Sequence, residues 1–119
     1  MKKTLVMGTS LNPSRYSNLA TIRLVDAGHK VVAFGLRDGC VNGISIDTEL
    51  KQYENIDTVT MYLGAKHQNE YYDYIISLNP KRVIFNPGTE NPEFYKLLSE
   101  KSIQFEESCT LVLLSTNQY

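Results

Sequence analysis

Short β-rich runs alternate with longer segments of helical periodicity along most of this chain, and no other feature of the sequence constrains the fold as strongly. Strand, helix and strand in succession are typical of βαβ units, in which a crossover helix joins two parallel strands. The first strand-like run, 4–7, is apolar as expected for a strand that is buried on both faces, whereas 57–63 alternates apolar and polar residues. The sequence therefore predicts an α/β fold with three layers around a doubly wound, mainly parallel sheet.

The boundaries of the elements follow from glycine, proline and the change of periodicity. Gly28 is expected to end the first helix in the left-handed conformation, and Pro92 is expected to open the last one. The predicted order is a strand at 4–7, a helix at 16–27, strands at 30–34 and 57–63, a helix at 68–78, a strand at 82–85, a helix after Pro92, and a final strand region at 103–105 and 110–114. The stretch 40–56 is less regular and suits a short edge strand followed by a helical turn. No repeat or linker interrupts the pattern, which predicts a single domain over residues 1–119.

Composition excludes several classes of partner. The 12 basic and 13 acidic side chains give a net charge of −1, so no overall positive field attracts nucleic acid. The longest apolar stretches, such as 31–34 and 111–114, are far shorter than the roughly 20 residues that cross a bilayer, which predicts no membrane association. Gly8, Ser10 and Asn12 interrupt the first apolar run before a signal peptide can form, so a cytoplasmic location with reduced cysteines is expected.

The turn after the first strand is the first candidate for a ligand site. In open parallel sheets the ligand binds beyond the carboxyl ends of the strands where the chain order reverses, and the first strand-to-helix turn usually takes part. Gly8 lets a ligand approach the backbone, Ser10 offers a hydroxyl group, and Arg15 brings a positive charge to a helix N-terminus, where it is unfavourable unless an anion binds. This combination favours a phosphate or pyrophosphate. The alternative is an ordinary turn with an exposed arginine.

Arg37 after the second strand narrows the class of nucleotide. The Gly-x-Gly-x-x-Gly fingerprint of NAD sites is absent, because Ser10 and Pro13 stand where glycine is required. An NAD site also has an acidic residue after the second strand to hold the ribose diol. Arg37 suits a phosphorylated ribose instead, either the 2′-phosphate of NADP or the 3′-phosphate of coenzyme A. The alternative is a surface ion pair between Arg37 and Asp38.

A third turn, Asn86-Pro87-Gly88, follows another strand at the same edge of the predicted sheet. Gly88 would let backbone amides approach a pyrophosphate or pantetheine group. A plain turn explains the same three residues. The case for a nucleotide site therefore depends on the convergence of the three loops.

No constellation of catalytic residues is visible, so an enzymatic activity is uncertain and a binding role is favoured. His29 and His67 have no cysteine or carboxylate nearby at metal-ligand spacing, and no metal is predicted. Cys109 follows Glu106 and Glu107, whose charges disfavour a reactive thiolate. We expect Cys109 to be a packed residue at the start of the final strand.

Four motifs are familiar as a set: Gly8-x-Ser10-x-x-Pro13-x-Arg15-x-Ser17, Gly28-His29-x-Val31, Asn86-Pro87-Gly88 and Glu107-Ser108-Cys109. On these motifs the sequence resembles the small bacterial CoA-binding proteins over most of its length. The resemblance implies a Rossmann-like domain similar to the CoA-binding domain of the succinyl-CoA synthetase α-subunit. It further implies that Gly8, Ser10 and Arg15 hold the pyrophosphate region and that Arg37 approaches the 3′-phosphorylated ribose. Asn86, Pro87 and Gly88 would line the opposite side.

Three hypotheses of function follow. The first is a non-enzymatic protein that binds coenzyme A or an acyl-CoA through Gly8, Ser10, Pro13, Arg15, Arg37, Asn86, Pro87 and Gly88. The second is an NADP-dependent oxidoreductase, or the remnant of one, that uses Arg37 for the 2′-phosphate. The third is an interaction protein that has lost its nucleotide ligand. The sequence leaves open whether the protein forms a homodimer or works with a partner enzyme.

Overall fold

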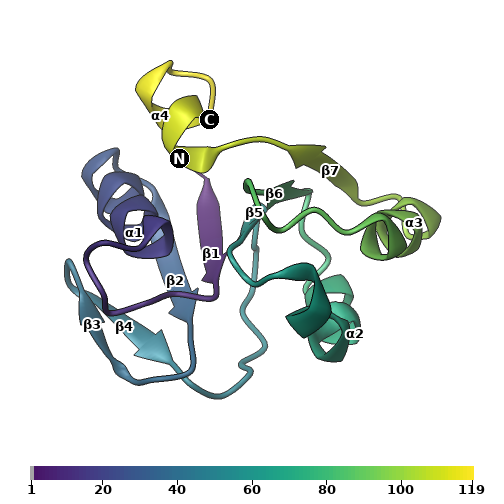
Figure 1. Ribbon diagram of the computed structural model, residues 1–119, viewed down its shortest axis with the longest axis horizontal. Coiled ribbons are helices and arrows are strands. Elements are labelled where there is room, and N and C mark those ends of the chain that lie inside the picture. Colours follow the sequence, from purple (N-terminus) through teal and green to yellow (C-terminus); the bar gives the residue numbers. More distant parts are fainter. Residues whose placement is uncertain (1) are drawn as a thin grey trace.

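The computed structural model describes residues 2–119 and is built around one sheet (Figure 1). Its strands within these residues are β1 Lys3–Met7, β2 Lys30–Phe34, β3 Gly39–Val41, β4 Ile44–Asp47, β5 Thr58–Met61, β6 Arg82–Phe85 and β7 Gln104–Glu107. They lie in the order β3-β4-β2-β1-β5-β6-β7, and every neighbouring pair is parallel except β3 and β4. The chain fills one side of β1 and then turns back to fill the other. This arrangement confirms the predicted doubly wound, mainly parallel sheet.

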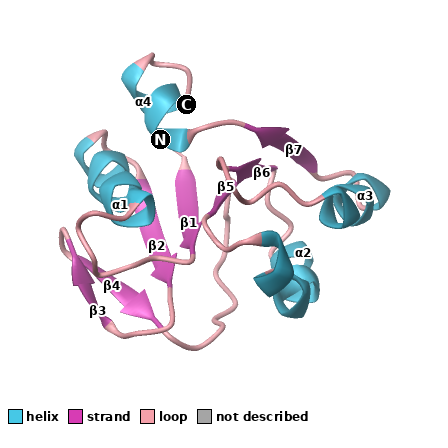
Figure 2. Ribbon diagram, viewed as in Figure 1, coloured by secondary structure: helices cyan, strands magenta, loops and turns pink. Residues whose placement is uncertain are grey.

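Helices cover both faces of the sheet (Figure 2). They are α1 Tyr16–Asp26, α2 Tyr72–Ser77, α3 Pro92–Glu100 and α4 Thr110–Ser115, with 3-10 turns η1 Ala65–His67 and η2 Asn69–Tyr71. Residues of α2 and α3 pack with Leu5 and Met7 of β1 in the larger apolar cluster, whereas α1 and α4 pack around Val6 on the other face. The three predicted layers are therefore present. Among residues 2–119 no helix has the length and apolar character that crossing a membrane requires.

Local sequence explains where the helices begin and end. Gly28 has a φ of 89° and donates its N–H to the Val25 carbonyl at 2.9 Å, while the His29 N–H reaches Leu24 at 3.1 Å. This is the paired bonding of a Schellman cap, and it confirms the predicted end of α1 at Gly28. Pro92 occupies the first turn of α3, and the Asn91 side chain accepts a hydrogen bond from the Phe94 N–H.

The prediction of a strand at 110–114 was wrong, because these residues form helix α4. A short apolar run such as Thr-Leu-Val-Leu-Leu fits a strand and a buried helix equally well by pattern alone. Two tertiary contacts decide the outcome. The Asn86 side chain accepts the Thr110 N–H at 2.8 Å, and the place beside β6 is already taken by β7.

For residues 40–56 the predicted short strand is present and the predicted helical turn is not. A strand is present, but it belongs to the β3–β4 hairpin, whose turn residues Asn42 and Gly43 have φ angles of 48° and 84°. Positive φ at both positions is what a tight two-residue hairpin turn requires. The predicted helical turn is wrong, since residues 48–57 contain no helix. This loop is held to the fold by side chains, for example by the hydrogen bond from the Tyr53 hydroxyl to Asp47.

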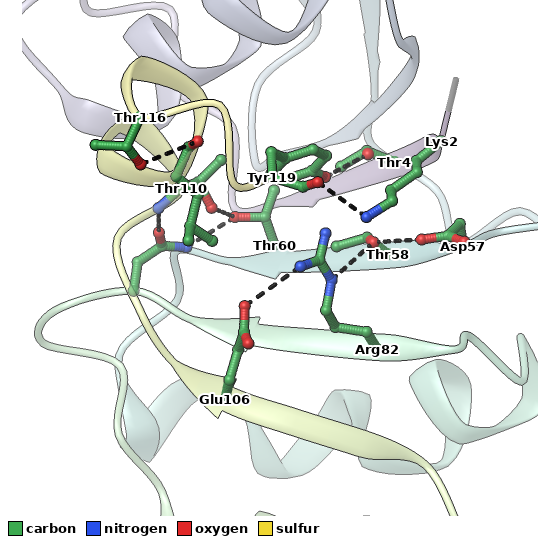
Figure 3. A network of polar contacts seen from close by, with 12 residues as sticks. Lys2, Thr4, Asp57, Thr58, Thr60, Arg82, Glu106, Thr110, Thr116 and Tyr119 are labelled. Atoms are coloured by element: carbon green, nitrogen blue, oxygen red, sulfur yellow. Dashed lines mark hydrogen bonds and ion pairs between the residues drawn. The ribbon is translucent and has the colours of Figure 1, made fainter.

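The face of the sheet near α4 carries a network of polar side chains (Figure 3). Thr60 and Thr110 share a hydrogen bond of 2.8 Å, and the Tyr119 hydroxyl lies 2.5 Å from the Thr4 hydroxyl. Arg82 bonds to Thr58 and to Glu106, and the Tyr119 ring lies over its guanidinium group at 4.8 Å. A half-buried arginine is thereby paired with a carboxylate and covered by an aromatic ring, while its Nη2 has no hydrogen-bond partner among the described residues.

We expect His29 to make stability depend on pH near neutrality. Its Nδ1 accepts the Lys2 N–H at 3.1 Å, which requires an unprotonated nitrogen. Burial, with the positive charges of Lys2 and Arg82 adding to it, lowers the pKa of His29 below its ordinary value of 6.5. The unfolded chain then binds a proton that the folded protein does not, so the free energy of unfolding falls as pH drops below about 6.5.

Urea unfolding at pH 7.5 and pH 5.5 measures this effect. His29→Asn, which keeps an acceptor without a titrating group, should lose less stability than the wild type over this range. His67→Asn is the control, because His67 is exposed, and it should behave like the wild type. Equal losses in the wild type and in His29→Asn would contradict the assignment.

Candidate functional site

The loop after β1 crosses the carboxyl end of β2. The N–H groups of Gly8 and Thr9 both donate to the Phe34 carbonyl, at 2.9 and 2.8 Å. Gly8 has a φ of 100°, a conformation that side chains disfavour. The loop is also fixed to α1, because the Ser10 N–H donates to the Ser17 hydroxyl and the Asn18 side chain donates to the Ser10 carbonyl. The backbone at 8–10 is therefore held at the switch point of the sheet.

A first cavity of about 360 Å³ opens between the ends of β1 and β2. Its walls combine apolar side chains with loop backbone and one arginine: Gly8, Thr9, Ser10, Leu11, Asn12, Phe34, Gly35, Leu36, Arg37 and Leu63. Both its size and its mixture of apolar walls with a few polar groups are typical of small-molecule sites.

A second cavity of about 350 Å³ lies on the other side of the same loop. It is lined by Gly8, Ser10, Arg15, Tyr16, Ser17, Tyr62, Gly64, Pro87, Gly88 and Thr89. Gly8 and Ser10 belong to both cavities, so the loop after β1 forms the ridge between them. A long ligand that lay across this ridge would reach both cavities at once.

Each cavity contains an arginine that has no carboxylate partner. The ion pairs found among residues 2–119 join Lys51 to Asp47, Lys81 to Asp57, and Arg82 to Glu106. Arg15 and Arg37 take part in none of them, and both are exposed. The alternative in which Asp38 neutralises Arg37 therefore has no support in the geometry. Two exposed guanidinium groups on either side of a glycine turn suit a ligand with separated phosphate groups.

The structure brings six of the eight predicted site residues to the cavities. These are Gly8, Ser10, Arg15, Arg37, Pro87 and Gly88. Pro13 is exposed in the same loop but lines neither cavity.

Asn86 lines neither cavity, because its side chain is turned into the protein. It is only 2% exposed. Its amide group donates to the Thr60 hydroxyl at 2.7 Å and to the Met61 carbonyl at 2.9 Å, and its carbonyl accepts the Thr110 N–H. All three bonds join β5, β6 and α4. Asn86 thus acts on the site by fixing the strand end that precedes Pro87 and Gly88.

The Gly88 backbone offers less to an anion than the sequence suggests. Its N–H donates to the Glu90 carboxylate at 2.9 Å. A phosphate at this place would compete with a negative charge for the same donor. The chemistry next to Gly88 therefore favours an uncharged part of a ligand.

Gln68, which no sequence motif indicated, connects a loop of the first cavity to a loop of the second without lining either. Gln68 is fully buried, and its amide donates to the carbonyls of Leu63 and Thr89, both at 2.8 Å. It also accepts from Asn91 at 3.0 Å. The loops of Leu63 and Thr89 that it connects are more than twenty residues apart in the sequence, and no local sequence pattern indicates this connection.

Tyr62 lines the second cavity, but its hydroxyl oxygen is buried. Burial raises the pKa of this phenol above its ordinary value, so it stays neutral. Among the described residues no group of three or more histidine, cysteine or carboxylate side chains is placed to hold a metal ion.

Comparison with known families places this geometry in context. The family model described as "CoA binding domain" matches residues 2–115. The chain belongs to this CoA-binding domain family. The family expectation drawn from the motif beginning at Gly8 is confirmed by this match. No curated protein matches the chain.

Solved structures of similar proteins share the fold of this CoA-binding family member. A crystal structure of an uncharacterized protein is 46% identical, with a TM-score of 0.97 over 100% of this chain and 98% of the other. A hypothetical protein from Pyrococcus horikoshii OT3 is 25% identical, with a TM-score of 0.87 over 97% and 82%. The cell-free ID.343 protein from Thermus thermophilus is 21% identical, with a TM-score of 0.87 over 99% and 90%, and its likeness shows the fold alone.

Proposed function

We propose that this protein binds coenzyme A or an acyl-CoA across the ridge formed by Gly8 and Ser10, as a non-enzymatic binding domain that comprises residues 1–119. The observation that carries the proposal is the pair of cavities on either side of this ridge, each with an unpaired arginine. The membership in the CoA-binding domain family supports the same ligand.

In this proposal each group of the ligand meets a matching environment. The adenine ring and the 3′-phosphate lie in the first cavity, against its apolar walls and beside Arg37. The pyrophosphate lies over the backbone of Gly8 and Ser10, with Arg15 beside it. The pantetheine arm then continues into the second cavity past Gly88, where the Glu90 carboxylate already takes the amide N–H. Along coenzyme A the 3′-phosphate and the pyrophosphate are charged and the pantetheine arm is uncharged. Arg37, Arg15 and the turn at Gly88 follow one another in the same order.

Calorimetric titration of the protein with coenzyme A tests the proposal directly. We expect saturable one-to-one binding. Absence of heat at millimolar coenzyme A would overturn it. Stabilisation against thermal unfolding by NADPH, with none by coenzyme A, would favour the NADP-dependent alternative, because Arg37 also suits a 2′-phosphate. Binding of neither ligand would favour an interaction protein without a nucleotide.

Arg37→Ala separates recognition of the 3′-phosphate from the rest of the site. A hydrogen bond to a charged group contributes about 1.5–3 kcal/mol, so the variant should bind coenzyme A about 10- to 150-fold more weakly. Its affinity for dephospho-coenzyme A should change less than about twofold, since that ligand has no 3′-phosphate. Titration of both ligands into both proteins measures the difference.

Arg23→Ala is the matched control, because Arg23 is an exposed arginine in the last turn of α1 and lines neither cavity. It should bind both ligands like the wild type. Equal loss of affinity for the two ligands in Arg37→Ala would mean that Arg37 does not contact the 3′-phosphate.

A further inference from the structure

The two cavities differ in chemistry, and the difference bears on which acyl groups the protein accepts. Apolar side chains gather in the first cavity, where Leu36 is 81% exposed, Leu11 is 43% exposed, and Phe34 forms the inner wall. These are exposed surfaces that a flat aromatic base would cover. Covering large exposed apolar side chains stabilises a complex by removing that surface from water.

The second cavity is lined more by backbone, hydroxyl and charged groups than by apolar side chains, although the 72% exposed Tyr16, Tyr62 and Pro87 also line it. Gly64 and Gly88 have open space where a Cβ would lie. Ser17 and Thr89 are buried, and their polar atoms are bonded within the protein, Ser17 to the Ser10 N–H and Thr89 to the Asn86 carbonyl. Arg15 is a full charge at the rim. An alkyl chain there gains less than it would in the first cavity, because it buries less apolar surface and takes water away from polar groups of the lining.

We infer, resting on the proposed function, that this site holds coenzyme A by its nucleotide end and leaves the thiol or thioester exposed to water. The protein then binds free coenzyme A and acyl-CoAs of different chain length with equal affinity. The group that the site recognises is the coenzyme A moiety itself, with or without a short or medium acyl group.

Titration with coenzyme A, acetyl-CoA and hexanoyl-CoA tests the inference. We expect dissociation constants within about threefold of one another. Four additional methylene groups, if buried, would tighten binding on the order of 100-fold at about 0.8 kcal/mol each. A tightening of tenfold or more from acetyl-CoA to hexanoyl-CoA overturns the inference and leaves the proposed function standing. Absence of binding by all three ligands overturns the proposed function and this inference together.

Leu36→Ser tests which end of the ligand the first cavity holds. If this cavity takes the adenine ring, the variant weakens coenzyme A and hexanoyl-CoA by the same factor, about fivefold for a loss of roughly 1 kcal/mol of apolar contact. Leu50→Ser is the matched control, since Leu50 is 46% exposed and lines neither cavity. A larger loss for hexanoyl-CoA than for coenzyme A would mean that the acyl chain occupies the first cavity, and the inference would be wrong.

The reactivity of the bound thiol gives a second readout. The double variant Cys40→Ser, Cys109→Ser removes both free protein thiols, so that an aromatic disulfide reagent reports only on coenzyme A. At saturating protein we expect the rate to stay within about threefold of that of free coenzyme A. Slowing by tenfold or more means that the thiol is enclosed, which overturns the inference.

Discussion

Gly35→Ala should destabilise the protein by about 3 kcal/mol, because the new methyl group would collide with backbone that hydrogen bonds hold in place. A Cβ at this position would lie 2.4 Å from the Thr9 carbonyl oxygen and 3.0 Å from Ile46. Thr9 is itself held by its N–H bond to Phe34, and the Gly35 N–H is bonded to Asp47 at 3.0 Å. The collision therefore has to be relieved by displacing the loop after β1.

This displacement should also weaken coenzyme A binding, because the displaced loop carries the ridge between the two cavities. We expect a loss of tenfold or more, about 1.4 kcal/mol, under conditions where circular dichroism shows the variant to be folded. Gly64→Ala is the control for stability, since a Cβ at Gly64 would meet no atom within 4 Å, and its unfolding in urea should match the wild type within about 0.5 kcal/mol. Wild-type stability in Gly35→Ala would refute the collision.

Asn86→Ala should also lower the free energy of unfolding by about 3 kcal/mol. It removes both donors and the acceptor of a buried amide, and it leaves the Thr110 N–H and the Met61 carbonyl without the partner they have now. A buried donor or acceptor that loses its partner costs about 1–3 kcal/mol. Because a domain of this size has only some 5–15 kcal/mol of stability, the loss should be plain in urea unfolding.

Asn69→Ala is the matched control for Asn86→Ala. Asn69 is exposed in η2, and its replacement should change stability by no more than about 0.5 kcal/mol. Hydrogen exchange adds a local readout, since the Thr110 amide should lose protection in Asn86→Ala before the amides of β1 do. Unchanged protection of Thr110 would show that Asn86 does not hold the start of α4.

The strands predicted well were those with strong local signals. Residues 4–7 and 82–85 are mainly apolar runs bounded by Gly8 and by Asn86-Pro87, and the structure has both strands at nearly these bounds. The alternation of strands and helices then predicted the carboxyl edge as the ligand site, because parallel strands end on one side. Gly8, Arg15 and Arg37 were therefore predicted as ligand-site residues from the sequence alone.

What the sequence could not predict depends on contacts between distant residues. Helix α4 is set by Asn86, which lies 24 residues before Thr110, and the inward orientation of the Asn86 side chain depends on the same contact. The engagement of Gly88 by Glu90 is local, yet the turn pattern alone did not indicate which donor the carboxylate would take. Gln68 connects two loops that have no shared motif. Each case is a hydrogen bond, and hydrophobic periodicity contains no information about the partner of a polar side chain.

The position of β1 at the centre of the sheet has a consequence for how the protein folds. Leu5 pairs with Val59 in β5, and the Thr4 hydroxyl meets Tyr119, 115 residues later. Closing such distant contacts costs chain entropy before any contact repays it, so proteins rich in them fold slowly. During synthesis, the edge of β1 that pairs with β5 therefore stays unpaired until β5 has left the ribosome.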